Sequence, residues 1–109
     1  MNRLIFSYNN QINFIDFNEI IFIERLQNKT IIHSLNKKIE TNESLTHIFE
    51  KLDQNTFFRI HRSYIVNINF IEKIVSCGQK SYKIIFKEVN EDALFSYDRY
   101  KEFKKSFIE

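Results

Sequence analysis

Residues 57–74 read FFRIHRSYIVNINFIEKI, and strand-forming apolar residues stand on both sides of a short polar segment within them. If residues 57–68 formed one continuous strand, Arg62 would lie in the middle of its apolar face. An unpaired guanidinium is very costly in a protein core. We therefore predict two buried strands joined by a turn at His61-Arg62-Ser63 that exposes Arg62. Loops on such rigid supports commonly carry binding residues.

The composition describes one globular domain, residues 1–109, that is long enough to bury a hydrophobic core. Hydrophobic residues make up 43% of the chain and aromatic residues 16%, mostly Phe, which favours strands. Because there is no Pro and only one Gly, the turns must be formed by residues such as Asn that tolerate left-handed backbone geometry. The candidate turn residues are Asn9-Asn10, Asn28, Asn36, Asn55 and Asn90.

The net charge of +2 is weakly basic and falls short of the strongly basic composition typical of nucleic-acid-binding domains. The basic surplus lies in residues 57–109, which include the segment quoted above. The single Cys77 cannot form an internal disulfide, which favours a reducing cytoplasm. The N-terminus has no signal-peptide pattern, and no stretch is apolar enough to span a bilayer. We therefore predict a cytoplasmic protein with no membrane partner.

Hydrophobic alternation predicts about ten short strands. Residues 19–25 are apolar on both faces, which indicates a central strand. Strands are expected over residues 3–8, 11–15, 19–25, 29–35, 38–41, 57–60, 64–67, 71–75, 81–87 and 93–96. Strands as closely spaced as these favour antiparallel sheets packed face to face over a parallel sheet with crossover helices.

Two segments have helical periodicity. From Leu45 to Leu52 apolar residues recur at i, i+3, i+4 and i+7, which predicts a mid-chain helix capped by Thr41 or Asn42. After the last strand, Asp98 is expected to cap a C-terminal helix with aromatic residues on one face and lysines on the other. The expected fold is therefore mainly β, with a short mid-chain helix and a C-terminal helix.

The segment around Arg62 resembles the signature of the LytTR DNA-binding domain, a module of bacterial transcription regulators. The family pattern is an aromatic-rich strand, Arg-x-His-Arg-Ser, an aromatic residue, Ile-Val-Asn and a second strand with Ile-x-x-Ile. This sequence supplies Phe58, Arg59, His61, Arg62, Ser63, Tyr64, Ile65, Val66, Asn67, Ile71 and Ile74 in that order. The resemblance runs over roughly residues 12–107, and includes a strand ending in Phe-Ile-Glu at Glu24 and the closing Phe95-Ser96.

The resemblance implies an elongated stack of three antiparallel sheets. It also implies sequence-specific binding of double-stranded DNA, with loops rather than a recognition helix inserted into successive major grooves. Family members commonly occupy paired direct repeats, so a homodimer on DNA is expected. The low net charge and Asp98 suggest an alternative, a protein-interaction module on the same fold with weak DNA affinity.

Three loops carry the expected base contacts. Arg62 matches the family position in the central loop and can bond guanine O6 and N7, worth about 1–3 kcal/mol of base discrimination; the alternative is a surface ion pair. Lys29 matches the family's second base-reading loop, where a solvated hairpin charge is an equal alternative. Arg99 belongs to the third loop, where Tyr97-Asp98 stands in place of the basic residues that often follow the serine.

Phosphate contacts are expected from Ser63, His61, Asn28 and Lys80. For Ser63 a hydrogen bond to the turn backbone is an equal alternative, for His61 a bond to the loop backbone is favoured over phosphate contact, and for Lys80 a solvated face is favoured. No acid near His61 in sequence would orient it for catalysis with Ser63. His33 and His47 lack a Cys or carboxylate cluster with metal spacing. We therefore predict no enzymatic activity, small-molecule substrate, metal or cofactor.

Overall fold

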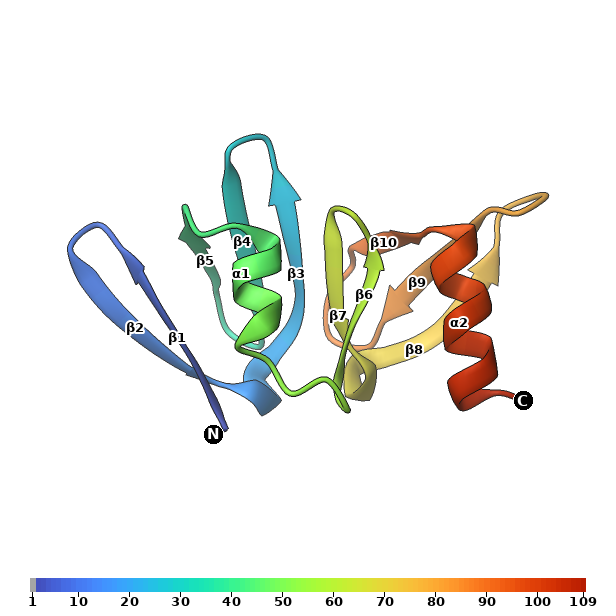
Figure 1. Cartoon of the computed structure of the whole chain (residues 1–109), viewed down its shortest axis with the longest axis horizontal. Coiled ribbons are helices and arrows are strands. Elements are labelled where there is room, and N and C mark those ends of the chain that lie inside the picture. Colours follow the sequence, from blue (N-terminus) through green and yellow to red (C-terminus); the bar gives the residue numbers. More distant parts are fainter. Residues whose placement is uncertain (1) are drawn as a thin grey trace.

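The computed structural model describes residues 2–109 and forms an elongated molecule of 44 × 28 × 23 Å. Three antiparallel sheets follow one another along the long axis (Figure 1). Their strands, in sheet order, are β1 (Arg3–Tyr8) and β2 (Gln11–Asp16); β5 (Lys38–Thr41), β4 (Lys29–Ser34), β3 (Ile20–Leu26), β7 (Tyr64–Asn67) and β6 (Phe57–His61); and β10 (Asp92–Phe95), β9 (Tyr82–Phe86) and β8 (Ile71–Ser76). The predicted mainly β fold of three antiparallel sheets is therefore confirmed.

The central five-stranded sheet is buried on both faces. One face packs against the β1–β2 hairpin and α1 (Leu45–Glu50), and Phe57 and Ile65 lie in this first core. The other face packs against the β8–β10 sheet and α2 (Tyr97–Phe107), and Ile60 and Val66 lie in this second core. Alternate residues of β6 and β7 therefore enter opposite cores, so the two strands that flank the central turn are held from both sides. The prediction of a central strand is also confirmed, because β3 lies in the middle of the sheet.

The prediction that Asn residues form the turns is correct at one hairpin and wrong at another. Asn9 and Asn10 have φ values of 52° and 62° and form the two-residue turn between β1 and β2, as predicted. In the β3–β4 turn the left-handed residue is Gln27, with φ of 57°, rather than Asn28. The prediction that Asn supplies the left-handed geometry was therefore wrong at this turn.

The N-cap of α1 was also predicted wrongly. Ser44 is the N-cap, and its hydroxyl accepts a hydrogen bond from the backbone N–H of His47 at 3.1 Å. Thr41 is unavailable because it is buried in β5, where its Oγ1 donates to the Ser7 carbonyl at 2.9 Å. The strand thus extends up to the residue that was expected to begin the helix.

Asp98 does not cap α2, contrary to the sequence prediction. The N-cap residue is Ser96, and Asp98 lies in the first turn with its side chain 91% exposed. Its carboxylate lies 3.7 Å from the ammonium of Lys101, in an exposed ion pair. None of the helices formed by residues 2–109 is long and apolar enough to cross a bilayer.

Candidate nucleic-acid interface

Four connections lie along one long side of the molecule, the upper side in Figure 1. They are the β3–β4, β6–β7 and β8–β9 turns and the junction between β10 and α2. The residues predicted to contact DNA lie in or beside these connections: Asn28, Lys29, His61, Arg62, Ser63, Lys80 and Arg99. The fold therefore places on one side residues that are up to 71 positions apart in the sequence (Asn28 to Arg99).

The central turn exposes Arg62. β6 ends at His61, β7 begins at Tyr64, and the register between the strands shifts between Arg59 and His61. Arg62 and Ser63 form the turn, and the Arg62 side chain is exposed. The predicted escape of this guanidinium from the apolar face is confirmed, and Ile60 on that face is 1% exposed.

Arg59 holds the backbone of this turn. Its Nη2 donates to the Arg62 carbonyl at 2.7 Å, its Nε donates to the His61 carbonyl at 3.3 Å, and its Nη1 donates to Thr46 Oγ1 at 3.2 Å. Partial burial, followed by the charge of Arg99, lowers the pKa of Arg59, although an arginine stays charged at neutral pH. Arg59 thus links the turn to α1, a role that its place in the sequence motif did not reveal.

His61 also bonds the turn backbone, in agreement with the structural interpretation of this residue. Its Nδ1 accepts a hydrogen bond from the Ser63 N–H at 3.1 Å, which requires that nitrogen to be unprotonated. Burial, followed by the charges of Arg62, Arg59 and Arg99, lowers the pKa of His61. The neutral imidazole therefore fits the hydrogen bond that orders the turn.

Ser63 is connected to the centre of the sheet through its backbone. Its carbonyl accepts a hydrogen bond from the Arg25 N–H at 2.9 Å, which extends the pairing of β3 with β7 into the turn. The Ser63 hydroxyl forms no hydrogen bond with residues 2–109. This hydroxyl is therefore available to an external acceptor or donor.

Arg99 lies beside the central turn because the start of α2 is bonded to β6. The Ser96 N–H donates to the Ile60 carbonyl at 2.9 Å, and Arg99 Nη1 donates to the Arg59 carbonyl at 3.0 Å. Within the described chain, the guanidiniums of Arg59, Arg62 and Arg99 form no salt bridge with a carboxylate. Three uncompensated positive charges in one region favour an anionic ligand.

Lys29 differs from this arginine cluster because it already has an acidic partner. Its Nζ donates to Glu40 Oε2 at 2.9 Å and to the Tyr8 hydroxyl at 3.3 Å. The hydrogen bond to Glu40 is the main cause of the raised pKa of Lys29, and the reciprocal bond lowers the pKa of Glu40. Both groups are exposed, and exposed ion pairs contribute little stability. Contact with DNA would therefore require Lys29 to exchange Glu40 for the ligand at a small cost.

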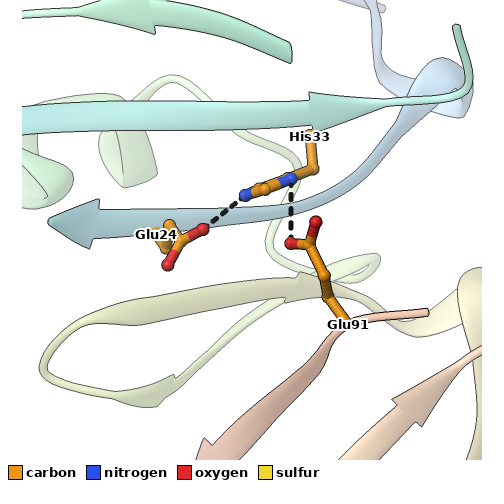
Figure 2. A group of neighbouring side chains, drawn as sticks. All are labelled: Glu24, His33 and Glu91. Carbon is orange, nitrogen blue, oxygen red and sulfur yellow. Dashed lines mark hydrogen bonds and ion pairs between the residues drawn. The ribbon is translucent and has the colours of Figure 1, made fainter. Parts of the chain in front are cut away.

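A His–carboxylate cluster that sequence spacing did not reveal lies between the second and third sheets (Figure 2). His33 is buried in β4; its Nε2 bonds Glu24 on β3, and its Nδ1 lies 3.4 Å from Glu91, which precedes β10. The contact between Nε2 and Glu24 is shorter than an ordinary hydrogen bond. The arrangement fits a polar link between sheets.

The chain is similar in sequence to known proteins over most of its length. The sequence profile of the LytTr DNA-binding domain matches residues 10–108. The sensory transduction protein LytT of Oceanobacillus iheyensis is 32% identical over 95 residues, which cover 86% of this chain and 39% of that protein. The transcriptional regulatory protein NatR of Bacillus subtilis is 26% identical over 94 residues, covering 86% of this chain and 40% of that protein.

A solved structure has the same fold. The LytTr DNA-binding domain of a Bacillus cereus protein superposes with a TM-score of 0.85, at 20% sequence identity, over 100% of this chain and 99% of that chain. The chain spans about two fifths of the length of the curated relatives that it matches. Most of the length of those relatives therefore lies outside the matched region.

Proposed function

Because this chain belongs to the LytTr DNA-binding domain family, we propose that it binds double-stranded DNA in a sequence-specific manner as part of a bacterial transcription regulator. The observation that carries the proposal is the exposed Arg62, in a turn whose backbone is held by Arg59 and His61. A guanidinium presented on a rigid turn can form two parallel hydrogen bonds with guanine O6 and N7. Rigidity matters because a flexible arginine would lose conformational entropy on binding.

The shape of the molecule supports contact with two successive major grooves. The long axis measures 44 Å, and the four connections lie along one side of it (Figure 1). Successive major grooves on one face of B-DNA are about 34–36 Å apart. A duplex lying along this side would meet loops from the second and the third sheet.

We assign base contacts to Arg62, Lys29 and Arg99, and phosphate contacts to Ser63, His61, Asn28 and Lys80. The free Ser63 hydroxyl and the exposed position of Asn28 support their assignments. Lys29 would give up its exposed partner Glu40 on binding. We expect the DNA site to consist of two direct repeats. Two copies of the chain would occupy them as a homodimer on the DNA.

A second function, a protein-interaction module with weak DNA affinity, is favoured by one observation. The carboxylate of Asp98 is 91% exposed in the helical turn that also carries Arg99, so it would face DNA phosphates brought to that turn. Like charges brought together in this way oppose binding. This alternative predicts weak binding that does not depend on DNA sequence.

The proposal is tested by selecting bound duplexes from random DNA and then measuring affinity for the selected and for unrelated duplexes at several salt concentrations. We expect enrichment of a defined sequence and an affinity that falls steeply with salt, because phosphate contacts release counterions. Specific binding is expected to be at least about a thousandfold tighter than binding to unrelated DNA. An absence of binding at low salt contradicts the proposal, and equal affinity for all duplexes favours the interaction module.

We further propose that the chain is a binding module without catalytic activity and that it acts in the cytoplasm. The Nδ1 atom of His61 is occupied by the Ser63 backbone and is therefore not placed to accept a proton from the Ser63 hydroxyl. An esterase assay with a generic substrate is expected to show no turnover above that of a Ser63→Ala variant.

A further inference from the structure

A surface cleft of about 300 Å³ lies between β9 and α2, beside the junction of β10 and α2. We call it the aromatic–lysine cleft, lined by Tyr82, Tyr97, Tyr100, Lys101, Lys104 and Lys105 together with Glu109. Three tyrosines and three lysines against one carboxylate make a positively charged, hydroxyl-rich surface. None of these residues belongs to the DNA contacts assigned above.

One lysine of the cleft, Lys101, and the neighbouring Lys80 contact an aromatic ring. The ammonium groups of Lys80 and Lys101 lie 5.4 and 4.9 Å from the centroid of the Tyr97 ring. The rings of Tyr82 and Tyr100 stack with centroids 3.8 Å apart. Cation–π contacts of this kind restrict otherwise flexible lysines without neutralising them. The Tyr97 ring therefore restrains Lys101, which lines the cleft, and Lys80 beside it, and leaves both lysines charged.

The acidic partners of these lysines are weakly bound. Lys101 lies 3.7 Å from Asp98 and Lys104 lies 3.7 Å from Glu109, and every member of the two pairs is about half exposed or more. Exposed ion pairs at this distance contribute little and are readily exchanged. A phosphate can therefore replace either carboxylate.

The position of the cleft identifies a DNA backbone as its occupant. Lys80 in the β8–β9 turn contacts Tyr97, and Tyr97 stands two residues before Arg99, so the end of the cleft at the start of α2 adjoins the side of the molecule that carries Arg99. From there the cleft follows α2 toward the C-terminus (Figure 1). Lysine is a compact point charge that suits phosphate rather than a bidentate base contact. We propose that the aromatic–lysine cleft binds phosphodiester groups of the duplex flanking the sequence read by the loops, through Lys101 and Lys104. This inference rests on the proposed DNA binding.

The test compares the wild-type chain with a Lys101→Gln, Lys104→Gln double variant on a selected duplex and on an unrelated duplex. We expect the slope of log affinity against log salt to become shallower by about 0.9 for each lost contact, and the affinity to fall about tenfold on both duplexes. The matched control is a Lys37→Gln, Lys87→Gln double variant. These two exposed lysines lie outside the cleft, in the β4–β5 and β9–β10 connections, which are on the side opposite the four loops (Figure 1). The control removes the same charge. It should retain the wild-type slope.

A second arm separates flanking contacts from general electrostatics. Shortening the selected duplex at the end that meets the cleft should weaken binding by the wild-type chain and leave binding by the cleft variant unchanged. Two results overturn the inference while leaving DNA binding intact. One is that the cleft variant and the wild type have the same slope of log affinity against log salt. The other is that both lose the same affinity on the shortened duplex. If the wild-type chain binds no duplex, the inference fails together with the proposed function.

Discussion

The guanidinium of Arg59 donates a hydrogen bond to the backbone carbonyl of Arg62, with 2.7 Å between Nη2 and the oxygen. One arginine of the central motif thus orders the backbone from which the other extends. The turn joins β6 and β7, whose side chains pack into both hydrophobic cores. The packed sheet therefore keeps the turn rigid. The two arginines therefore differ: Arg59 bonds the turn, whereas Arg62 is exposed and is the residue that we propose contacts DNA.

Replacing Arg59 with Lys should loosen the turn while conserving charge. A lysine cannot reproduce the three bonds to the Arg62 and His61 carbonyls and to Thr46. We expect faster amide hydrogen exchange in residues 61–63 and affinity for the selected duplex about tenfold lower, with little change in binding to unrelated DNA. Exchange rates like those of the wild type would show that the turn does not depend on Arg59.

The imidazole of His61 should titrate below the value of about 6.5 typical of a free histidine. Burial lowers its pKa, and Arg62, Arg59 and Arg99 act in the same direction. The unfolded chain then binds the proton more readily than the folded one, so the stability that His61 contributes is present above pH 6.5 or so and is lost as the pH falls through the lower folded pKa. A nuclear magnetic resonance titration of the ring protons measures the midpoint; a value at or above that of free histidine contradicts the expectation.

Asn67 should be a principal determinant of stability. It is fully buried, its Nδ2 donates to the carbonyls of Ile20 and Phe17, and its Oδ1 accepts from the Asn69 N–H. Asn67→Ala leaves these groups without partners, and we expect a loss of about 2–4 kcal/mol in the free energy of unfolding. Denaturant unfolding measures it. The control Asn69→Ala, at an exposed position, should change stability by no more than about 0.5 kcal/mol.

The two carboxylates beside His33 should contribute unequally to stability. Glu24 forms a hydrogen bond with the buried imidazole, whereas Glu91 lies 3.4 Å from Nδ1, without a hydrogen bond, and is 39% exposed. Glu24→Ala should cost about 1–3 kcal/mol because it leaves a buried nitrogen unpaired. Glu91→Ala should cost less than about 1 kcal/mol. A larger loss for Glu91→Ala would show that the link between the second and third sheets depends on the exposed acid.

The order of polar and apolar residues along the sequence predicted those features that are set by residues close together in the chain. The polar segment within the apolar run at 57–68 predicted the exposed turn, because Arg62 could not remain on a buried face. The double-sided burial of β3 followed in the same way from its uninterrupted apolar residues. The predicted cap of α1 was wrong because Thr41 could serve either a strand or a helix. Its pairing with Thr30 of β4 and its side-chain hydrogen bond to the Ser7 carbonyl hold it in β5.

The interactions that the sequence did not predict join residues on different elements. Arg59 reaches Thr46 on α1 and the turn carbonyls at once, and Lys29 pairs with Glu40 across two strands. Glu91 is 58 residues from His33, so spacing could not bring them together. The motif pointed to a candidate interface, but the contacts that hold its central turn could be found only from the three-dimensional arrangement.

The central claim, that Arg62 reads a base from a rigid turn, is tested most directly by measuring affinity for the selected duplex and for duplexes with single base-pair changes. The measurement uses the wild type, Arg62→Ala and, as a control that keeps the charge, Arg62→Lys. We predict that Arg62→Ala loses about 1–3 kcal/mol of discrimination at one base pair, and that Arg62→Lys restores overall affinity more fully than discrimination. A uniform loss on every duplex, with discrimination unchanged at all positions, contradicts the claim.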